Sequence, residues 1–226
     1  MEYVYICRSG ENEELRYSLR SISKNAPEGR VWLVGGKPDW YSGNFISVRA
    51  TSHKYNNARN NLHAIVGSSE ISDNFVLMND DFFVVRKVDE IKTYHGGLLS
   101  DKINRYKSEP GTTVYTGMLT TTYRTLRRKG VDAPLDYELH VPMPMTKEGL
   151  SMALQANCLW RSAYGNLANV GGEQTVDVKY YGSASKRTSY PLDGDMPYLS
   201  SEDYSFSEML PMLENIFQNP SKYESI

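Results

Sequence analysis

Residues 74–83 read Asn-Phe-Val-Leu-Met-Asn-Asp-Asp-Phe-Phe, an apolar run that leads into an amide and two adjacent carboxylates. A short apolar run rich in β-branched and aromatic residues predicts a buried strand, which we place at residues 74–78. Adjacent carboxylates at the end of a buried strand are costly unless a positive charge compensates them. The stretch therefore predicts a central strand with a charged site at its carboxyl end.

The residues before this stretch alternate between strand-like and helix-like patterns. Short apolar runs predict strands at residues 3–7, 31–34 and 45–49, and apolar side chains at helical spacing predict helices at residues 12–24 and 56–66. This alternation predicts an α/β domain with a mixed, largely parallel sheet flanked by helices. Ligands of such sheets bind at the carboxyl ends of the strands, which is where the two carboxylates stand.

The second half of the chain is less regular. Residues 95–145 are rich in Gly, Thr, Tyr and Arg and include several prolines, which predicts loops, short helices and a hairpin. Further on we expect a helix at residues 147–160, a strand at residues 175–181 and an amphipathic helix at residues 205–217. The length of 226 residues predicts a single domain.

The composition is that of an ordinary globular protein, with 40% apolar and 23% charged residues. A formal net charge of -2 disfavours a general nucleic-acid binder. The two cysteines, Cys7 and Cys158, give neither a disulfide framework nor a zinc motif, which favours a reducing, cytoplasmic location. No apolar run is long enough to predict a membrane span.

Asp80 and Asp81 are the candidate metal ligands. Mg²⁺ and Mn²⁺ prefer hard oxygen ligands, often one or two carboxylates together with phosphate oxygens. A cation held there could bridge the diphosphate of a nucleotide and neutralise the leaving group, as the Asp-x-Asp site of GT-A glycosyltransferases does. The alternative is a turn at a strand end whose two acids are solvated.

Several short segments resemble, in the same order along the chain, the shared motifs of the Stealth family of sugar-phosphate transferases. The matching segments are residues 14–22 with 25–27 and 31–34, residues 38–40 (Pro-Asp-Trp), residues 55–57 (Tyr-Asn-Asn), residues 75–83, residues 140–142 (His-Val-Pro) with Lys147, Arg161, and residues 217–224. The first region of the family is compressed here into residues 3–10. The family has a Glu after its Phe-Asn-Ser motif, which residues 55–57 match. At that place this chain has residues 59–61 (Arg-Asn-Asn).

The resemblance implies a GT-A-like, Rossmann-related core that transfers sugar-1-phosphate from a nucleotide sugar, a UDP-sugar being one candidate, to an acceptor hydroxyl. It implies Mg²⁺ or Mn²⁺ at Asp80 and Asp81, a catalytic part for Asp81 and His140, and stabilisation of phosphate charge by Arg161. Residues 1–90 would bind the donor and residues 91–226 would hold the acceptor. Two alternatives stay open: plain glycosyl transfer to a glycan, a protein or a modified DNA base, and a sugar-nucleotide-binding module without catalysis.

Further basic and amide side chains are candidates for binding the donor: Arg8, Arg16, Arg20, Asn56 and Asn79. Arg16 and Arg20 lie one helical turn apart and share a face, and a solvated helix face is the alternative for both.

Three other features could belong to the site. The basic cluster Arg124, Arg127, Arg128 and Lys129 could bind a polyanionic acceptor, including DNA, although such runs are commonly solvated helix faces. Residues 95–97 (His-Gly-Gly) could form a lid over the donor or a plain turn. Asp203 could add a further carboxylate.

Overall fold

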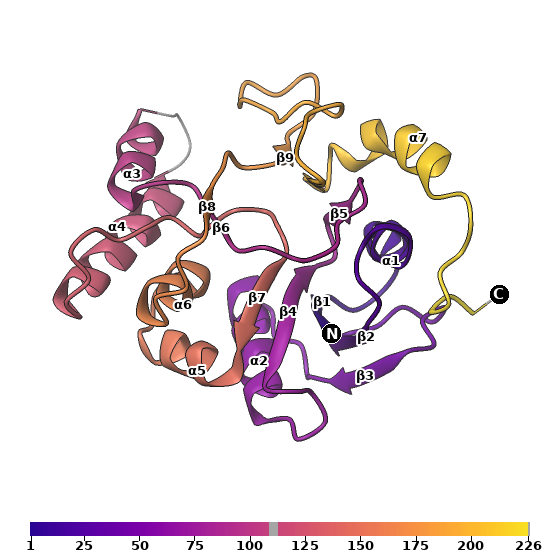
Figure 1. Cartoon of the computed structure of the whole chain (residues 1–226), viewed down its shortest axis with the longest axis horizontal. Coiled ribbons are helices and arrows are strands. Elements are labelled where there is room, and N and C mark those ends of the chain that lie inside the picture. The colour runs from indigo at the N-terminus through magenta and orange to yellow at the C-terminus, as the bar shows by residue number, and fades with distance from the viewer. Residues whose placement is uncertain (109–112, 226) are drawn as a thin grey trace. The chain divides into compact units, whose positions relative to one another are not determined.

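The computed structural model describes residues 1–108 and 113–225, apart from the side chains of Lys54 and Thr113. The chain folds into two compact units. Unit 1 comprises Met1–Ile91, His140–Pro144 and Asp177–Ile226, and unit 2 comprises Lys92–Leu139 and Met145–Val176. Figure 1 shows the helices and strands of the chain, coloured from the N-terminus to the C-terminus.

A five-stranded sheet forms the centre of unit 1, in the order β3-β2-β1-β4-β7. The pairs β1/β2, β1/β4 and β2/β3 are parallel, with Tyr5 in register with both Leu33 and Met78. The strands are β1 (Glu2–Cys7), β2 (Arg30–Gly35), β3 (Asn44–Ser47), β4 (Asn74–Asn79) and β7 (Met143–Thr146), of which Met143 and Pro144 belong to unit 1. Strands β1 and β4 are almost entirely buried, which explains why they read as continuous apolar runs. The predicted α/β fold with a largely parallel sheet is confirmed.

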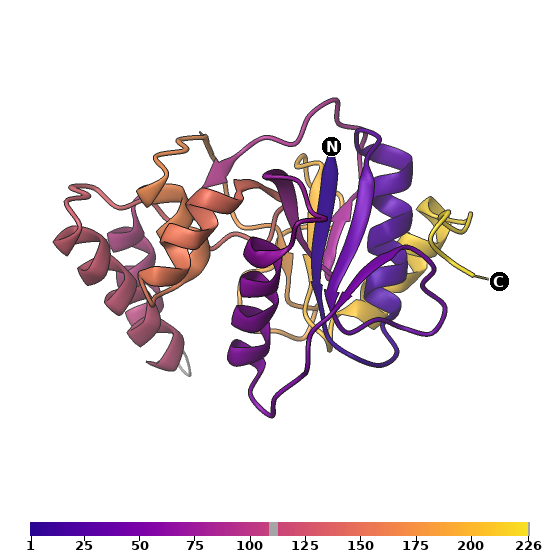
Figure 2. The same ribbon diagram turned by 90° about the horizontal axis from the view of Figure 1, so that it is seen from below.

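Two helices connect the parallel strands. Helix α1 (Glu13–Asn25) follows β1, and α2 (Lys54–Gly67) precedes β4. They cover opposite faces of the sheet (Figure 2), as right-handed crossovers in opposite directions require. Asn12 caps α1, because its side chain accepts a hydrogen bond from the backbone N–H of Leu15 at 3.1 Å.

A second, three-stranded sheet in unit 1 has the order β5-β10-β9. Its strands are β5 (Phe82–Val84), β9 (Lys179–Tyr180) and β10 (Tyr198–Ser201), and β10 runs antiparallel to β5. Helix α7 (Phe206–Ile216) buries Met209 and Leu213 against Phe83 and Leu199 of this sheet. The strand expected at residues 175–181 is therefore wrong in extent, because only its last part pairs with β10.

Unit 2 is mainly helical. Its elements are β6 (Tyr94–His95), α3 (Leu99–Lys107), α4 (Thr113–Arg128), α5 (Lys147–Gln155), α6 (Trp160–Leu167) and β8 (Glu173–Gln174). Leu99 and Ile103 of α3 pack against Leu119 and Leu126 of α4. The short helices expected within residues 95–145 are thus present, although α3 and α4 occupy much of the segment where loops and a hairpin were also expected.

The helix expected at residues 147–160 begins at Lys147 as predicted but ends at Gln155, and a second helix begins at Trp160. Asn157 adopts a left-handed backbone conformation with φ of 52° between α5 and α6. Asn is among the residues that tolerate this conformation, and it interrupts the α-helical hydrogen-bond ladder.

Across the described part of the chain, no helix combines the length and the apolar character needed to cross a membrane.

Candidate functional site

Asp80 and Asp81 lie directly after β4 and are both half-buried. The Asn12 side chain donates a hydrogen bond from Nδ2 to Oδ2 of Asp80 at 2.6 Å while its Oδ1 caps α1. Asn12 thus links the N-terminus of α1 to the carboxylate of Asp80. The carboxyl end of β1 contributes Arg8 to the same region.

Asp81 is held by two donors from the second sheet. Lys179 Nζ lies 3.0 Å from Asp81 Oδ2, and Ser200 Oγ donates to the same oxygen at 2.9 Å. Burial by itself would raise the pKa of Asp81, but the electrostatic interactions with Lys179 and His140 and the hydrogen bonds from Lys179 and Ser200 lower it below its ordinary value. Asp81 is therefore ionised at neutral pH.

Glu14, in the first turn of α1, is the third carboxylate. It accepts a hydrogen bond from Ser201 Oγ at 2.7 Å and lies 3.6 Å from the Arg8 guanidinium. Burial, with the nearby charges of Asp81 and Asp80, raises the pKa of Glu14 to about 7. Burial and the charge of Asp81 likewise raise the pKa of Asp80 to about 6. Ionising Glu14, Asp80 and Asp81 together costs free energy, and a bound cation would reduce that cost.

The charge around Asp80 and Asp81 is incompletely balanced by the chain itself. Five carboxylates (Glu14, Asp80, Asp81, Glu202 and Asp203) share two cationic side chains, Arg8 and Lys179. Hard oxygen donors with excess negative charge suit Mg²⁺ or Mn²⁺. Among the described residues, no group of three or more His, Cys, Asp or Glu side chains is arranged to hold a metal ion. A cation at Asp80 and Asp81 would therefore take its other ligands from water or a phosphate.

His140 and Asp177 form a dyad beside these acids. The Nδ1 atom of His140 lies 2.9 Å from Asp177 Oδ2, and the backbone N–H of His140 donates to Asp177 Oδ1 at 3.0 Å. The ring meets Phe82 edge to face, with centroids 6.3 Å apart. A carboxylate that accepts a hydrogen bond from Nδ1–H fixes the tautomer, which leaves Nε2 as the proton acceptor. The imidazole is about one third exposed, at 32%.

Two of the five candidates for donor binding reach this cluster. Arg8 contacts Glu14 and lies 3.8 Å from Asp203. Asn79 precedes Asp80, and its buried Oδ1 has no hydrogen-bond partner within the described residues. That acceptor fits a ligand that carries a hydroxyl or N–H donor.

The other three candidates lie elsewhere. Arg16 and Arg20 both bind the buried carboxylate of Glu224, at 3.0 and 2.7 Å, and Arg16 also stacks on Trp40. Asn56 is exposed in the first turn of α2. Their side chains contribute nothing to the carboxylate cluster in this structure.

Arg161 belongs to unit 2, where it is buried on α6. Burial raises the pKa of Glu138, and the charges of Lys102 and Arg161 oppose that rise. Lys102 is itself buried and lies 2.9 Å from Asp136. Arg161 is thus part of a buried charge network inside unit 2.

Three other sequence candidates of unit 2, Arg127, Arg128 and His95, have local partners. At the end of α4, Arg127 lies 3.1 Å from Asp132, and Arg128 hydrogen-bonds to its own helix. These contacts add no support for a DNA acceptor. His95 lies in β6, and its Nδ1 accepts a hydrogen bond from the backbone N–H of Gly97, as in a turn.

The sequence interpretation missed Asn12, Asp177, Lys179 and Ser200. A signal for two of them was present, because residues 175–181 alternate and therefore place Asp177 and Lys179 on one side of an extended chain.

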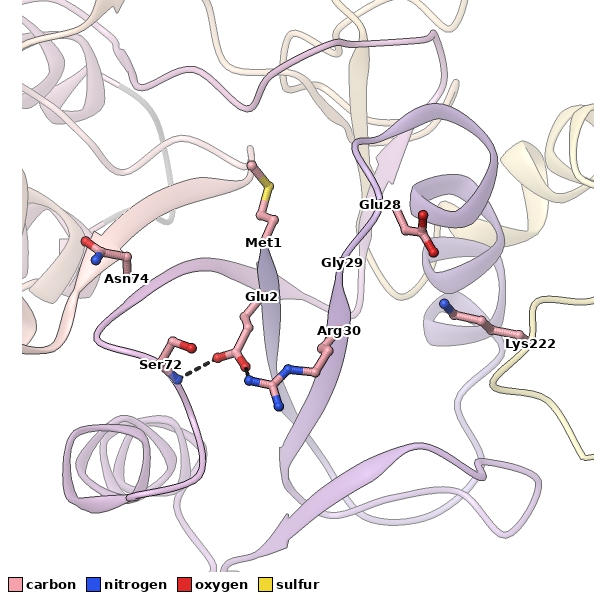
Figure 3. A pocket seen from close by; sticks show the side chains of 8 residues that line it. All are labelled: Met1, Glu2, Glu28, Gly29, Arg30, Ser72, Asn74 and Lys222. Carbon is pink, nitrogen blue, oxygen red and sulfur yellow. Dashed lines mark hydrogen bonds and ion pairs between the residues drawn. The ribbon is translucent and has the colours of Figure 1, made fainter.

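A pocket of about 600 Å³ lies at the opposite end of the sheet, by the first residues of β1, β2 and β4 (Figure 3). There Glu2 pairs with Arg30 and accepts a hydrogen bond from the backbone N–H of Ser72 at 2.6 Å. Parallel sheets bind their ligands at the carboxyl ends, so the carboxylate cluster remains the candidate site.

The fold is that of the GT-A glycosyltransferases, as two solved structures show. An active-site mutant of LgtC has a TM-score of 0.53 at 9% identity. The galactosyltransferase LgtC in complex with donor and acceptor sugar analogs has a TM-score of 0.54 at 10% identity. Each alignment covers 98% of this chain and 98% of the other. No protein-family model and no curated protein sequence matches the chain, so its resemblance to the Stealth family stays a prediction.

Proposed function

We propose that this protein is a metal-dependent transferase that uses a nucleotide-sugar donor. The observation that carries the proposal is the arrangement of Asp80 and Asp81 at the carboxyl end of β4, with the His140–Asp177 dyad next to them. Such a site on a GT-A fold combines cation ligands with a proton acceptor. Those are the two functions that transfer from a nucleotide diphosphate to a hydroxyl requires.

Each side chain has a distinct part in the proposal. Asp80 and Asp81 hold Mg²⁺ or Mn²⁺, which would neutralise charge on the donor phosphates. His140, held by Asp177, accepts the proton of the acceptor hydroxyl at Nε2. Arg8, beside Glu14, is placed to bind donor phosphate, and Asn79 accepts a hydrogen bond from the donor. An acceptor hydroxyl on a glycan or a protein fits this chemistry.

The Stealth resemblance favours transfer of sugar-1-phosphate, whereas plain glycosyl transfer is the alternative on the same site. The two reactions release different nucleotides. Attack on the phosphorus next to the sugar breaks the pyrophosphate bond and releases a nucleoside monophosphate. Attack on the anomeric carbon releases a nucleoside diphosphate.

The experiment is chromatographic identification of the nucleotide released from a panel of UDP- and GDP-sugars in the presence of Mn²⁺. We expect release that chelation abolishes and that Asp81→Asn lowers by at least about 10²-fold, since Asp81 would hold the cation. Asp195→Asn, at an exposed carboxylate between β9 and β10, is the matched control. Release that survives both chelation and Asp81→Asn would overturn the proposal.

A further inference from the structure

Lys179 is a buried cation among the carboxylates. Its side chain is 8% exposed, and its Nζ lies 3.0 Å from Asp81 Oδ2 and 3.6 Å from Glu202 Oε1. Strand β9 holds it there, because Lys179 is in register with Ser200 of β10, the second donor to Asp81. The ammonium thus occupies the side of Asp81 that faces the second sheet.

A buried ion pair of this kind is weak evidence for stability, since replacing such pairs with apolar side chains is often neutral or stabilising. The position of Lys179, in contact with one of the two carboxylates after β4, indicates instead a part in the chemistry of the site.

Lys179 and a divalent cation would compete for Asp81, because both place positive charge at the same carboxylate. A divalent cation binds carboxylate oxygens at roughly 2.0–2.6 Å, and two cations at such separations repel strongly where water is largely excluded. The lysine stem has four rotatable bonds, so its ammonium can leave Asp81 while its backbone stays in β9.

We propose that Lys179 is a resident counter-ion of Asp81 that competes with a divalent cation and, once released, binds the diphosphate of the donor. The competition depends only on the contacts of Lys179, whereas the diphosphate step rests on the proposed function. In the absence of a cation, Lys179 balances Asp81. With a cation at Asp81, the freed ammonium is a point charge suited to phosphate oxygens.

The first experiment measures Mn²⁺ binding without any nucleotide, by electron paramagnetic resonance of free Mn²⁺. Lys179→Met removes the competing charge and keeps the apolar stem, so we expect Mn²⁺ to bind at least about tenfold more tightly than to wild type. Lys179→Arg keeps the charge and should stay near wild type. Lys186→Met, at an exposed lysine of the same unit, is the matched control and should change nothing.

Lys179→Gln provides a second uncharged variant if Lys179→Met does not fold, because Gln can still donate a hydrogen bond to Asp81. It too should bind Mn²⁺ more tightly than wild type. An affinity that is unchanged or weaker in the uncharged variants would overturn the competition.

The second experiment measures binding of UDP and of inorganic pyrophosphate at saturating Mn²⁺. We expect Lys179→Met to bind both about tenfold more weakly than wild type, and Lys179→Arg to retain most of the affinity. Equal binding by wild type and Lys179→Met would overturn the diphosphate step. If wild type binds Mn²⁺ in competition with Lys179 but binds no nucleotide or nucleotide sugar, the proposed function fails and the competition stands.

Discussion

Both carboxylate oxygens of Asp177 lie within hydrogen-bond distance of His140 Nδ1, and Oδ1 also accepts from the His140 backbone N–H. In Asp177→Asn the backbone contact can persist, because the amide oxygen still accepts. The amide NH₂ would then face Nδ1 and favour the tautomer with its proton on Nε2, which cannot accept a proton. We expect kcat to fall about 10²-fold with little change in the donor KM, measured by nucleotide release over a range of donor concentrations.

Asp193→Asn is the control for this change, because Asp193 is an exposed carboxylate of the same unit. It should leave kcat unchanged. His140→Ala should lower kcat at least as far as Asp177→Asn does, since the carboxylate acts through the ring. A kcat near wild type in either dyad variant would show that the dyad is only structural.

The positions of individual site residues could be predicted from the sequence where the neighbouring residues form a recognisable pattern. Asp80 and Asp81 follow an apolar run, so their place at a strand end could be inferred. Lys179 and Ser200 are distant in sequence from Asp81 and from each other. Only the pairing of β9 with β10 brings these two residues together, so the sequence could not place them at the site. Arg16 and Arg20 were expected at the donor, but their helix face binds Glu224, a partner about 200 residues away that spacing rules cannot supply.

Glu224 links the carboxyl-terminal segment to α1 through ion pairs with Arg16 and Arg20. Burial alone would raise the pKa of Glu224, but hydrogen bonds from Arg20, the Ser221 backbone and Arg16 lower it to about 2. A carboxylate whose pKa is lower in the folded state stabilises the fold above its unfolded pKa of about 4.3. That contribution is lost as the pH falls from about 5 towards 2.

We therefore expect Glu224→Gln to lower the free energy of unfolding by about 1–2 kcal/mol at pH 7, a figure reduced for solvent screening of Arg16 and Arg20. The difference from wild type should shrink as the pH falls from 5 towards 2. Denaturant titrations at several pH values measure it. Glu214→Gln, on an exposed position of α7, is the comparison, and a pH-independent difference for Glu224→Gln would contradict the assignment.

Elements with a strong periodic pattern were predicted well, and those that depend on distant pairing were not. Strands β1, β2 and β4 are buried by helices on both faces, so their apolar runs are unambiguous. Strands β5 and β10 contain few residues, and only their antiparallel pairing makes them strands. Helix α4 contains Gly117 and several threonines, which have low helix propensity, yet packing of Leu119 and Leu126 against α3 stabilises it.

At the scale of the whole chain, unit 1 is assembled from three separate segments, and the candidate site uses all three. Asp80 and Asp81 come from the first segment, His140 from the second, and Asp177 and Lys179 from the third. A motif search along the chain finds the first two segments. The third can be added only once the fold shows that the chain returns to unit 1 at Asp177.

Each unit also has its own core, so a cavity in one unit should separate stability from cation binding. Leu77 of β4 and Leu119 of α4 are both fully buried, and Leu→Ala at such positions costs about 2–5 kcal/mol. We expect Leu119→Ala, in unit 2, to lower the unfolding free energy but to leave Mn²⁺ affinity unchanged at temperatures where the protein stays folded. Leu77→Ala should weaken Mn²⁺ binding as well, because the cavity lies in the strand that carries Asp80 and Asp81. Calorimetric unfolding with Mn²⁺ titration of both variants tests this, and a loss of Mn²⁺ affinity in folded Leu119→Ala would mean that unit 2 contributes to the cation site.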